Sequence, residues 1–346
     1  MKIFNSLSLL IVMLSLFTSS CASKKKKVDP NAVDFSFIAS GDYPYGKWQG
    51  DQFKNEFFPA IEKENADFII HVGDIKGGSG LCTDALYQDV YKLLNQFSIP
   101  LFYTPGDNEW TDCHRPRTRA KAPISADIKK FTYPKERLAK LRNIFYQDPR
   151  ISLAGKSGIK IVAKSQPKEF QEFPLMVENQ MWNYKGFLFA SLHIVGSNNN
   201  APFKGRGGDR GEYELRDKAN IQWLRYAFKQ AKMKNSRALV LYYHAEVDFE
   251  PNPKKRYGFT NFLKELETLA PTYAGQVLLI HGDSHAMTID RPLLIPGDRF
   301  ENPIPNVMRL EVPGGYQQMG YVKVEVLKRS NDFLRFRPVY LPIPKK

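Results

Sequence analysis

Five short apolar runs in this chain each end in aspartate or histidine, and this repeated ending constrains the fold more than any other feature. The runs cover residues 34–42, 66–74, 99–107, 238–244 and 276–285. Each is continuous and rich in β-branched or aromatic residues, which is typical of a strand buried on both faces. Gly-Asp is a common turn pair, so one such ending would be weak evidence, but five in register are hard to explain as turns and indicate a shared functional edge.

Helical patterns separate several of these runs. Ile221, Leu224 and Phe228 recur at helical spacing ahead of one run, and residues 261–269 precede the last run. Strands that alternate with helices predict an α/β fold, in which ligands bind beyond the carboxyl ends of the strands. Carboxylates and imidazoles that converge there would repel each other or lose their hydration unless a cation held them together. The sequence therefore predicts a metal site with two ions.

The first residues predict export. Lys2 precedes a largely apolar run over residues 3–17, which is too short for a membrane span of ~20 residues and is typical of a secretory signal. Cys21 follows small residues and resembles the acylated cysteine of bacterial lipoproteins. We expect a signal peptide over residues 1–20 and a lipidated basic tether over residues 21–33, with a plain cleaved signal as the alternative. The protein would then be anchored to a bacterial membrane, in the periplasm or at the cell surface.

Two further cysteines and the net charge limit the compartment and the partners. Cys82 and Cys113 are an even pair in a chain expected to be exported, and each follows a Gly-Asp ending, so we predict a disulfide between them. The formal net charge of +14 favours anionic partners such as phosphate esters, nucleic acid or an anionic membrane. A merely soluble basic surface is the alternative, and charge alone does not separate these.

The order of the strand endings resembles that of the calcineurin-like metallophosphoesterase family, which includes the purple acid phosphatases. That family carries Asp-x-His or Gly-Asp, then Gly-Asp, Gly-Asn-His-Asp/Glu, a lone histidine and Gly-His-x-His. The resemblance implies a four-layer α/β/β/α sandwich with two mixed β-sheets, formed here by residues 34–346 as a single domain. It also implies metal ligands, with the second of them bridging two ions. These are Asp42, Asp74, Asp107, His244, Asp283 and His285.

The first metal site departs from the family pattern in two places. Pro44 stands at the histidine of Asp-x-His and cannot ligate, and Gly77 stands where the purple acid phosphatases have a tyrosine. The ligands that remain for this site are Asp42, Asp74 and His285, with Tyr43 and Tyr45 as candidates for a further one.

The second metal site is more anionic than in the family. It would hold Asp74, Asp107, His244 and Asp283, where two of the aspartates replace an asparagine and a histidine. Oxygen-rich anionic sites suit hard cations. We therefore expect two divalent or trivalent ions, from manganese, magnesium, calcium or iron, with zinc disfavoured.

The catalytic loop follows the third strand ending. Asn108 falls on the family's catalytic histidine, and an amide can donate a hydrogen bond but cannot supply a proton. His114, in the same loop, is the candidate replacement, with a solvated surface histidine as the alternative. Arg115 is a candidate clamp for phosphate oxygens, since a guanidinium can donate two parallel hydrogen bonds.

These observations predict an exported metal-dependent phosphoesterase that hydrolyses phosphate esters with a metal-activated water. A lipoprotein of the same fold that binds a metal or an anion without catalysis is one alternative, favoured by the missing histidines. A cell-surface nuclease or phosphodiesterase is the other, favoured by the positive charge. Proteins that bind single-stranded nucleic acid alternate aromatic and basic residues along the binding groove, and this sequence shows no such alternation. Nucleic acid is therefore not the favoured partner.

Overall fold

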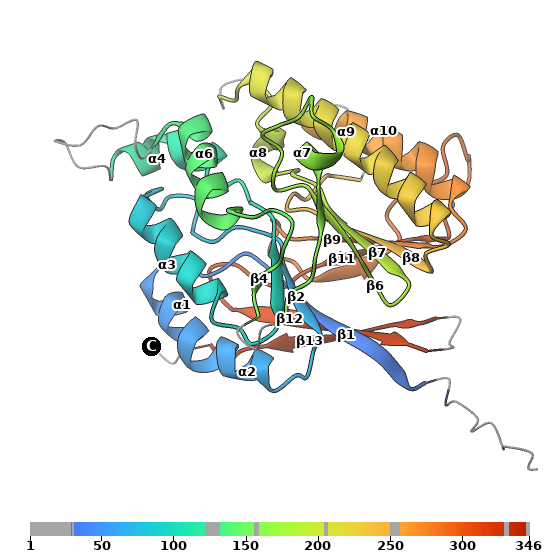
Figure 1. Ribbon diagram of the computed structural model, residues 1–346. Helices are drawn as coiled ribbons and strands as arrows, with labels where there is room; N and C mark the ends of the chain where they lie inside the picture. Colours follow the sequence, from blue (N-terminus) through green and yellow to red (C-terminus); the bar gives the residue numbers. More distant parts are fainter. Residues whose placement is uncertain are drawn as a thin grey trace, which may run out of the picture.

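Two β-sheets packed face to face form the centre of the molecule, with helices on both outer faces (Figure 1). The computed structural model describes residues 29, 31–121, 132–155, 159–203, 207–249, 257–328 and 332–343. The expected signal peptide and the lipidated Cys21 lie outside the described residues. Within the described part of the chain, no helix combines the length and apolar character needed to cross a membrane.

The first sheet has the strand order β13-β12-β1-β2-β3-β4. Its strands are β1 (Val33–Ser40), β2 (Phe68–His71), β3 (Pro100–Tyr103), β4 (Leu153–Ala154), β12 (Gly320–Leu327) and β13 (Leu334–Tyr340). β1, β2 and β3 are parallel, with Phe37 opposite Phe68 and Ile69 opposite Leu101, whereas the other pairs are antiparallel. The three parallel strands therefore end at one edge.

The second sheet has the order β10-β11-β9-β8-β7-β6-β5. Its strands are β5 (Lys164–Ser165), β6 (Gln180–Tyr184), β7 (Phe187–Ser191), β8 (Ala238–Tyr242), β9 (Gln276–His281), β10 (Thr288–Asp290) and β11 (Val307–Glu311). β7, β8, β9 and β11 are parallel, and the pairs at the two ends of the sheet are antiparallel. All five apolar runs form strands as predicted, as β1, β2, β3, β8 and β9.

Helices cover the outer face of each sheet (Figure 1). The first sheet is covered by α1 (Lys47–Gln52), the π-helix η1 (Phe53–Phe57), α2 (Phe58–Glu62), α3 (Asp84–Leu94) and α6 (Pro134–Phe145). The second is covered by α9 (Arg210–Met233) and α10 (Thr260–Leu269), which are the two helices that the periodicity predicts. The other elements of the described residues are short: η2 (Thr111–His114), α4 (Pro116–Arg119), α7 (Gln166–Glu169), α8 (Gly196–Asn199), η3 (Tyr257–Phe259) and η4 (Ala270–Thr272). The predicted four-layer α/β/β/α sandwich is confirmed.

Aromatic side chains fill the space between the two sheets. Trp182 on β6 is 2% exposed and stacks on Phe102 of β3, with ring centroids 3.4 Å apart. It also stacks on Phe189 of β7, while Phe37 stacks on Phe68 within the first sheet. Large buried rings contribute much apolar area and orient one another, so this layer holds the two sheets in a fixed alignment.

The predicted disulfide between Cys82 and Cys113 is present. Cys82 directly precedes Thr83, whose side chain caps α3, and Cys113 lies in η2. Because the bond joins the loops that follow β2 and β3, it fixes two neighbouring strand ends to each other.

We predict that Trp182→Ala lowers the free energy of unfolding by ~3–5 kcal/mol, because it removes a ring that touches both sheets and leaves a cavity. Chemical denaturation followed by circular dichroism measures the loss. Val162→Ala is the matched control, since Val162 is 74% exposed and its truncation should cost less than ~0.5 kcal/mol. Equal losses in both variants would contradict the role given to this layer.

Candidate metal centre

The six predicted ligands lie at one edge of the two sheets, just beyond the strands. Asp42, Asp74 and Asp107 follow β1, β2 and β3, whereas the other three follow β8 and β9 of the second sheet. The structure brings five of them into two compact groups, in each of which the ligand atoms lie within 4.8 Å of one another. The groups are Asp42, Asp74 and His244, and Asp107, His244 and Asp283. His244 belongs to both.

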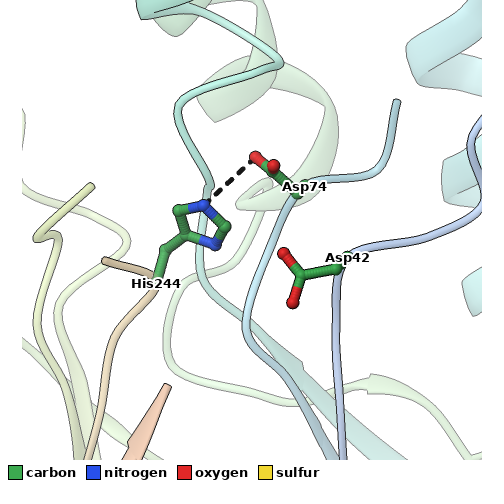
Figure 2. Close-up of side chains that lie close together, drawn as sticks. All are labelled: Asp42, Asp74 and His244. Carbon is green, nitrogen blue, oxygen red and sulfur yellow. Dashed lines mark ion pairs between the residues drawn. The ribbon is translucent and has the colours of Figure 1, made fainter. Parts of the chain in front are cut away.

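The imidazole of His244 faces the carboxylates of Asp74 and Asp42 (Figure 2). Its Nδ1 donates a hydrogen bond of 2.8 Å to the carbonyl oxygen of Val72, so in the neutral ring Nε2 carries a lone pair. Nε2 lies 3.3 Å from carboxylate oxygens of both Asp74 and Asp107, yet it is buried without a hydrogen-bond partner. A lone pair that faces carboxylates is repelled unless a proton or a metal ion lies between them, and several buried carboxylates that converge on one imidazole fit a metal ion.

The electrostatics of the groups agree with that fit. Burial raises the pKa of Asp42, Asp74 and Asp283 above the usual range, and nearby carboxylates raise each of them further. Burial alone would lower the pKa of His244, but the carboxylates, that of Asp74 foremost, raise it well above its usual value. Buried like charges at this spacing destabilise one another, and a bound cation removes the penalty.

His285 lies at the border of the centre. Its Nε2 is 4.0 Å from Asp42 and 3.2 Å from the hydroxyl of Tyr45, and it belongs to neither compact group. Tyr45 donates a hydrogen bond of 3.0 Å to Asp74. Tyr43 instead donates to the carbonyl of Gly320. Of the two tyrosines that the sequence offers, Tyr45 is therefore the one at the metal centre.

Several ligands are held in left-handed backbone conformations. The φ angle is 60° at Asp42, 55° at Asp74, 82° at Asp283 and 67° at His285. Residues other than glycine rarely adopt such angles, and they concentrate at sites where the surrounding structure enforces them. One contact that holds Asp42 and Asp283 in these conformations is a hydrogen bond of 3.1 Å from the backbone amide of Asp283 to the carboxylate of Asp42.

The loop after β3 holds Asp74 in place through hydrogen bonds. The backbone amide of Asn108 donates to Oδ1 of Asp74 at 3.0 Å, and its side-chain amide donates to Oδ2 at 2.5 Å. The carboxylate of Glu109 accepts hydrogen bonds from the backbone amides of Asp74 and Gly106. Gly106 cannot be replaced without moving this loop, because a Cβ there would collide with Asp74. Asn108 therefore orients a predicted bridging ligand in this structure.

A left-handed turn packs against the second group of ligands. Ser197, Asn198, Asn199 and Asn200 have φ angles of 51°, 55°, 54° and 56°, and asparagine tolerates this region better than most residues. The hydroxyl of Ser197 lies 2.5 Å from Asp107 and 2.8 Å from Asp112, so its single proton serves one carboxylate at a time. The turn thereby places a hydroxyl beside a metal ligand.

Arg216 on α9 binds this turn through hydrogen bonds and has no exposed surface. Its guanidinium donates to the side chain of Asn199 at 2.5 Å and to the backbone carbonyl of Asn199 at 2.8 Å. It also donates to the carbonyl of His193 and to the carboxylate of Glu212. A single buried cation thus satisfies the backbone carbonyl of Asn199 in the left-handed turn and the carbonyl of His193 before it.

Arg115 and His114 lie beside the centre, on the side of Asp107. Arg115 pairs with Asp112 at 2.5 Å and donates to the hydroxyl of Ser197 at 2.7 Å, while 48% of its side chain stays exposed. Burial, together with the charge of Asp107, raises the pKa of Asp112 to about 7. Nδ1 of His114 donates to the carbonyl of Thr111 at 2.5 Å. Its Nε2 edge faces Gly207, where an added Cβ would lie 2.6 Å away.

Four residues of this centre were missed by sequence reasoning: Lys76, Asp112, Ser197 and Arg216. The run of three asparagines after Ser197 is a usable signal, since asparagine favours left-handed conformations. Lys76 is 1% exposed and donates to the carbonyl of Asn108 at 2.5 Å. Nothing in the local sequence distinguishes Lys76, Asp112 or Arg216 from surface charges.

Comparisons with known proteins give one family match. A family model described as calcineurin-like phosphoesterase matches residues 47–287, well over half of the chain. A search of the curated proteins finds no match. Among solved structures, the chain is similar to GAP50, the anchor in the inner membrane complex of Plasmodium. That match has 14% sequence identity and a TM-score of 0.41, and it covers 91% of this chain and 90% of the other.

We predict that His244→Ala abolishes metal binding at both groups, because His244 is the ligand that they share. Elemental analysis after dialysis against each metal should show a metal-to-protein ratio near background, and the metal should no longer raise the melting temperature. Asp74→Asn should give the same result, because Asp74 is the predicted bridging ligand. His114→Ala is the control and should keep the wild-type ratio. Full occupancy in His244→Ala would show that the groups do not hold metal.

Proposed function

This chain belongs to the calcineurin-like phosphoesterase family, and we propose that it is an active metal-dependent phosphoesterase with two ions at the edge of its sheets. The observation that carries the proposal is the buried Nε2 of His244, which faces three carboxylates without a hydrogen-bond partner. Such a donor set has little use except to hold cations.

The chemistry that such ions supply when bound is neutralisation of phosphoryl charge and activation of water. The protein's own residues set the geometry. Asp74 belongs to the group with Asp42 and His244, and it is oriented by Asn108. Arg115, whose guanidinium is held by Asp112 and Ser197, is half exposed and is placed to donate to phosphoryl oxygens. The substrate would enter from the side of Arg115.

The ligand chemistry favours hard cations. Four carboxylates and a single shared imidazole make an oxygen-rich donor set, which suits manganese, magnesium, calcium or iron better than zinc. The test is activity and metal content after reconstitution of metal-free protein with each ion in turn. Highest activity with zinc would contradict this preference.

The activity itself is tested with metal-free and reconstituted protein on phosphomonoesters, bis-p-nitrophenyl phosphate and DNA. Metal-dependent hydrolysis of an ester supports the proposal. Stoichiometric metal without turnover of any ester would instead support a binding protein, a candidate favoured by the engagement of Asn108 with Asp74 in place of a proton donor. Salt-sensitive cleavage of DNA would identify a nuclease.

We predict that this enzyme hydrolyses aryl esters much faster than alkyl esters. A correctly positioned general acid accelerates the reaction by ~10²–10⁴-fold, mostly when the leaving group is poor. The amide of Asn108 supplies no proton. Asn108→His should narrow the gap between p-nitrophenyl phosphate and an alkyl phosphate in steady-state assays. If His114 is the acid, His114→Ala should slow the alkyl ester much more than the aryl ester. Fast alkyl-ester turnover that neither substitution changes would refute both assignments.

We further propose that the chain is exported and anchored through lipidated Cys21. The Cys82–Cys113 disulfide supports an oxidising compartment. In a bacterial host, Cys21→Ala should abolish labelling by fatty acid and move the protein from the membrane fraction to the soluble one. Ser23→Ala, in the same segment, is the control and should change neither. Membrane retention of Cys21→Ala without labelling would contradict the lipid anchor.

A further inference from the structure

A cavity of about 990 Å³ adjoins the metal centre. Ser197 and Asp112 belong to its wall, and the hydroxyl of Ser197 contacts the metal ligand Asp107. The cavity therefore begins where the second group of ligands ends. Its volume is that of a small-molecule site and far exceeds the space that one phosphate group fills.

Two arginine side chains line this cavity. Arg115 and Arg119 are four residues apart on α4 and its flank, and the backbone amide of Arg119 donates to the carbonyl of Arg115 at 3.0 Å. Arg117, on the same turn, is exposed and is not part of the lining.

Arg115 and Arg119 differ in their ion-pair partners. Arg115 is paired with Asp112, the sole acidic side chain in the lining that the structure describes. Arg119 is exposed and has no ion-pair partner among the described residues. Arg119 also lines a second hollow of about 560 Å³ that continues past His114. An unpaired guanidinium inside a cavity is a ready site for an anion.

The lining of the cavity also has an apolar part. Phe203, Phe259 and Pro116 line the cavity, and Phe203 is 41% exposed. A ligand in this cavity would therefore contact an apolar surface as well as Arg119.

We propose that this cavity is a second anion subsite, and that the preferred substrate is a small phosphate ester with a second phosphate group. Arg119 binds the second phosphate, the aromatic wall contacts the carbon linker, and the ester to be cleaved lies at the metal centre. This inference rests on the proposed function for the cleaved group. The binding of the second group depends only on Arg119 and the cavity.

Two matched probes test the subsite: propane-1,3-diol bisphosphate and propyl phosphate, which differ only in the second phosphate. Wild-type reconstituted protein should show a lower KM for the bisphosphate. Arg119→Gln should raise that KM about five- to tenfold, a loss of about 1–1.4 kcal/mol, and change the KM of propyl phosphate by less than about twofold. kcat should stay within about twofold for both probes, because Arg119 does not touch the reacting atoms.

Arg117→Gln is the control, since it removes an equal charge from the same turn outside the cavity. Equal effects of Arg117→Gln and Arg119→Gln would reduce the result to general electrostatics and overturn the proposal. The subsite proposal would also be overturned if the wild-type protein hydrolysed propyl phosphate but showed no preference for the bisphosphate. That outcome would leave the proposed function intact.

Calorimetric titration of the reconstituted protein with the same probes separates the two proposals. If no ester is hydrolysed but the bisphosphate binds more tightly and Arg119→Gln removes the difference, the subsite stands and the proposed activity fails. If neither hydrolysis nor a difference in binding is found, both fail.

Discussion

The hydrogen bond from Nδ1 of His244 to the carbonyl of Val72 joins the two sheets at the edge where the metal centre lies. His244 follows β8 in the second sheet, and Val72 follows β2 in the first. The bond fixes the ring so that Nε2 faces the carboxylates that follow the first sheet. A second link, from the amide of Asp283 to Asp42, spans the same junction. The aromatic layer between the sheets keeps this edge aligned, because it prevents one sheet from sliding over the other.

Much of the fold could be predicted because local sequence patterns determine it. The five buried strands, helices α9 and α10, and the pairing of Cys82 with Cys113 all follow from runs, spacings and motif order. The compact grouping of five predicted ligands follows from parallel strands that end at one edge. The choice between Tyr43 and Tyr45 could not be predicted, since it depends on which way each side chain turns after β1.

The parts that escaped prediction depend on partners distant in the chain. Arg216 looks like any basic residue of an amphipathic helix, yet it is fully buried and bonded to Asn199 and to the carbonyl of His193. Asp112 resembles a loop carboxylate, and its burial is set by Arg115 and Ser197. A buried charge requires a complete set of partners, and those partners become apparent only when the chain has folded. The same holds for Asn108, whose amide is committed to Asp74.

If the chain is exported as proposed, the disulfide has a consequence for which metal the protein would acquire. The bond closes residues 82–113 into a ring that includes β3 and Asp107, and it braces the loop that orients Asp74. On the proposed route of export, this ring closes only after the chain has left the reducing cytosol. The fully braced centre then first meets metal outside the cell interior, where the abundance of each ion differs from that in the cytosol. Because proteins discriminate poorly among divalent ions by affinity alone, the place of oxidation helps to decide the resident metal.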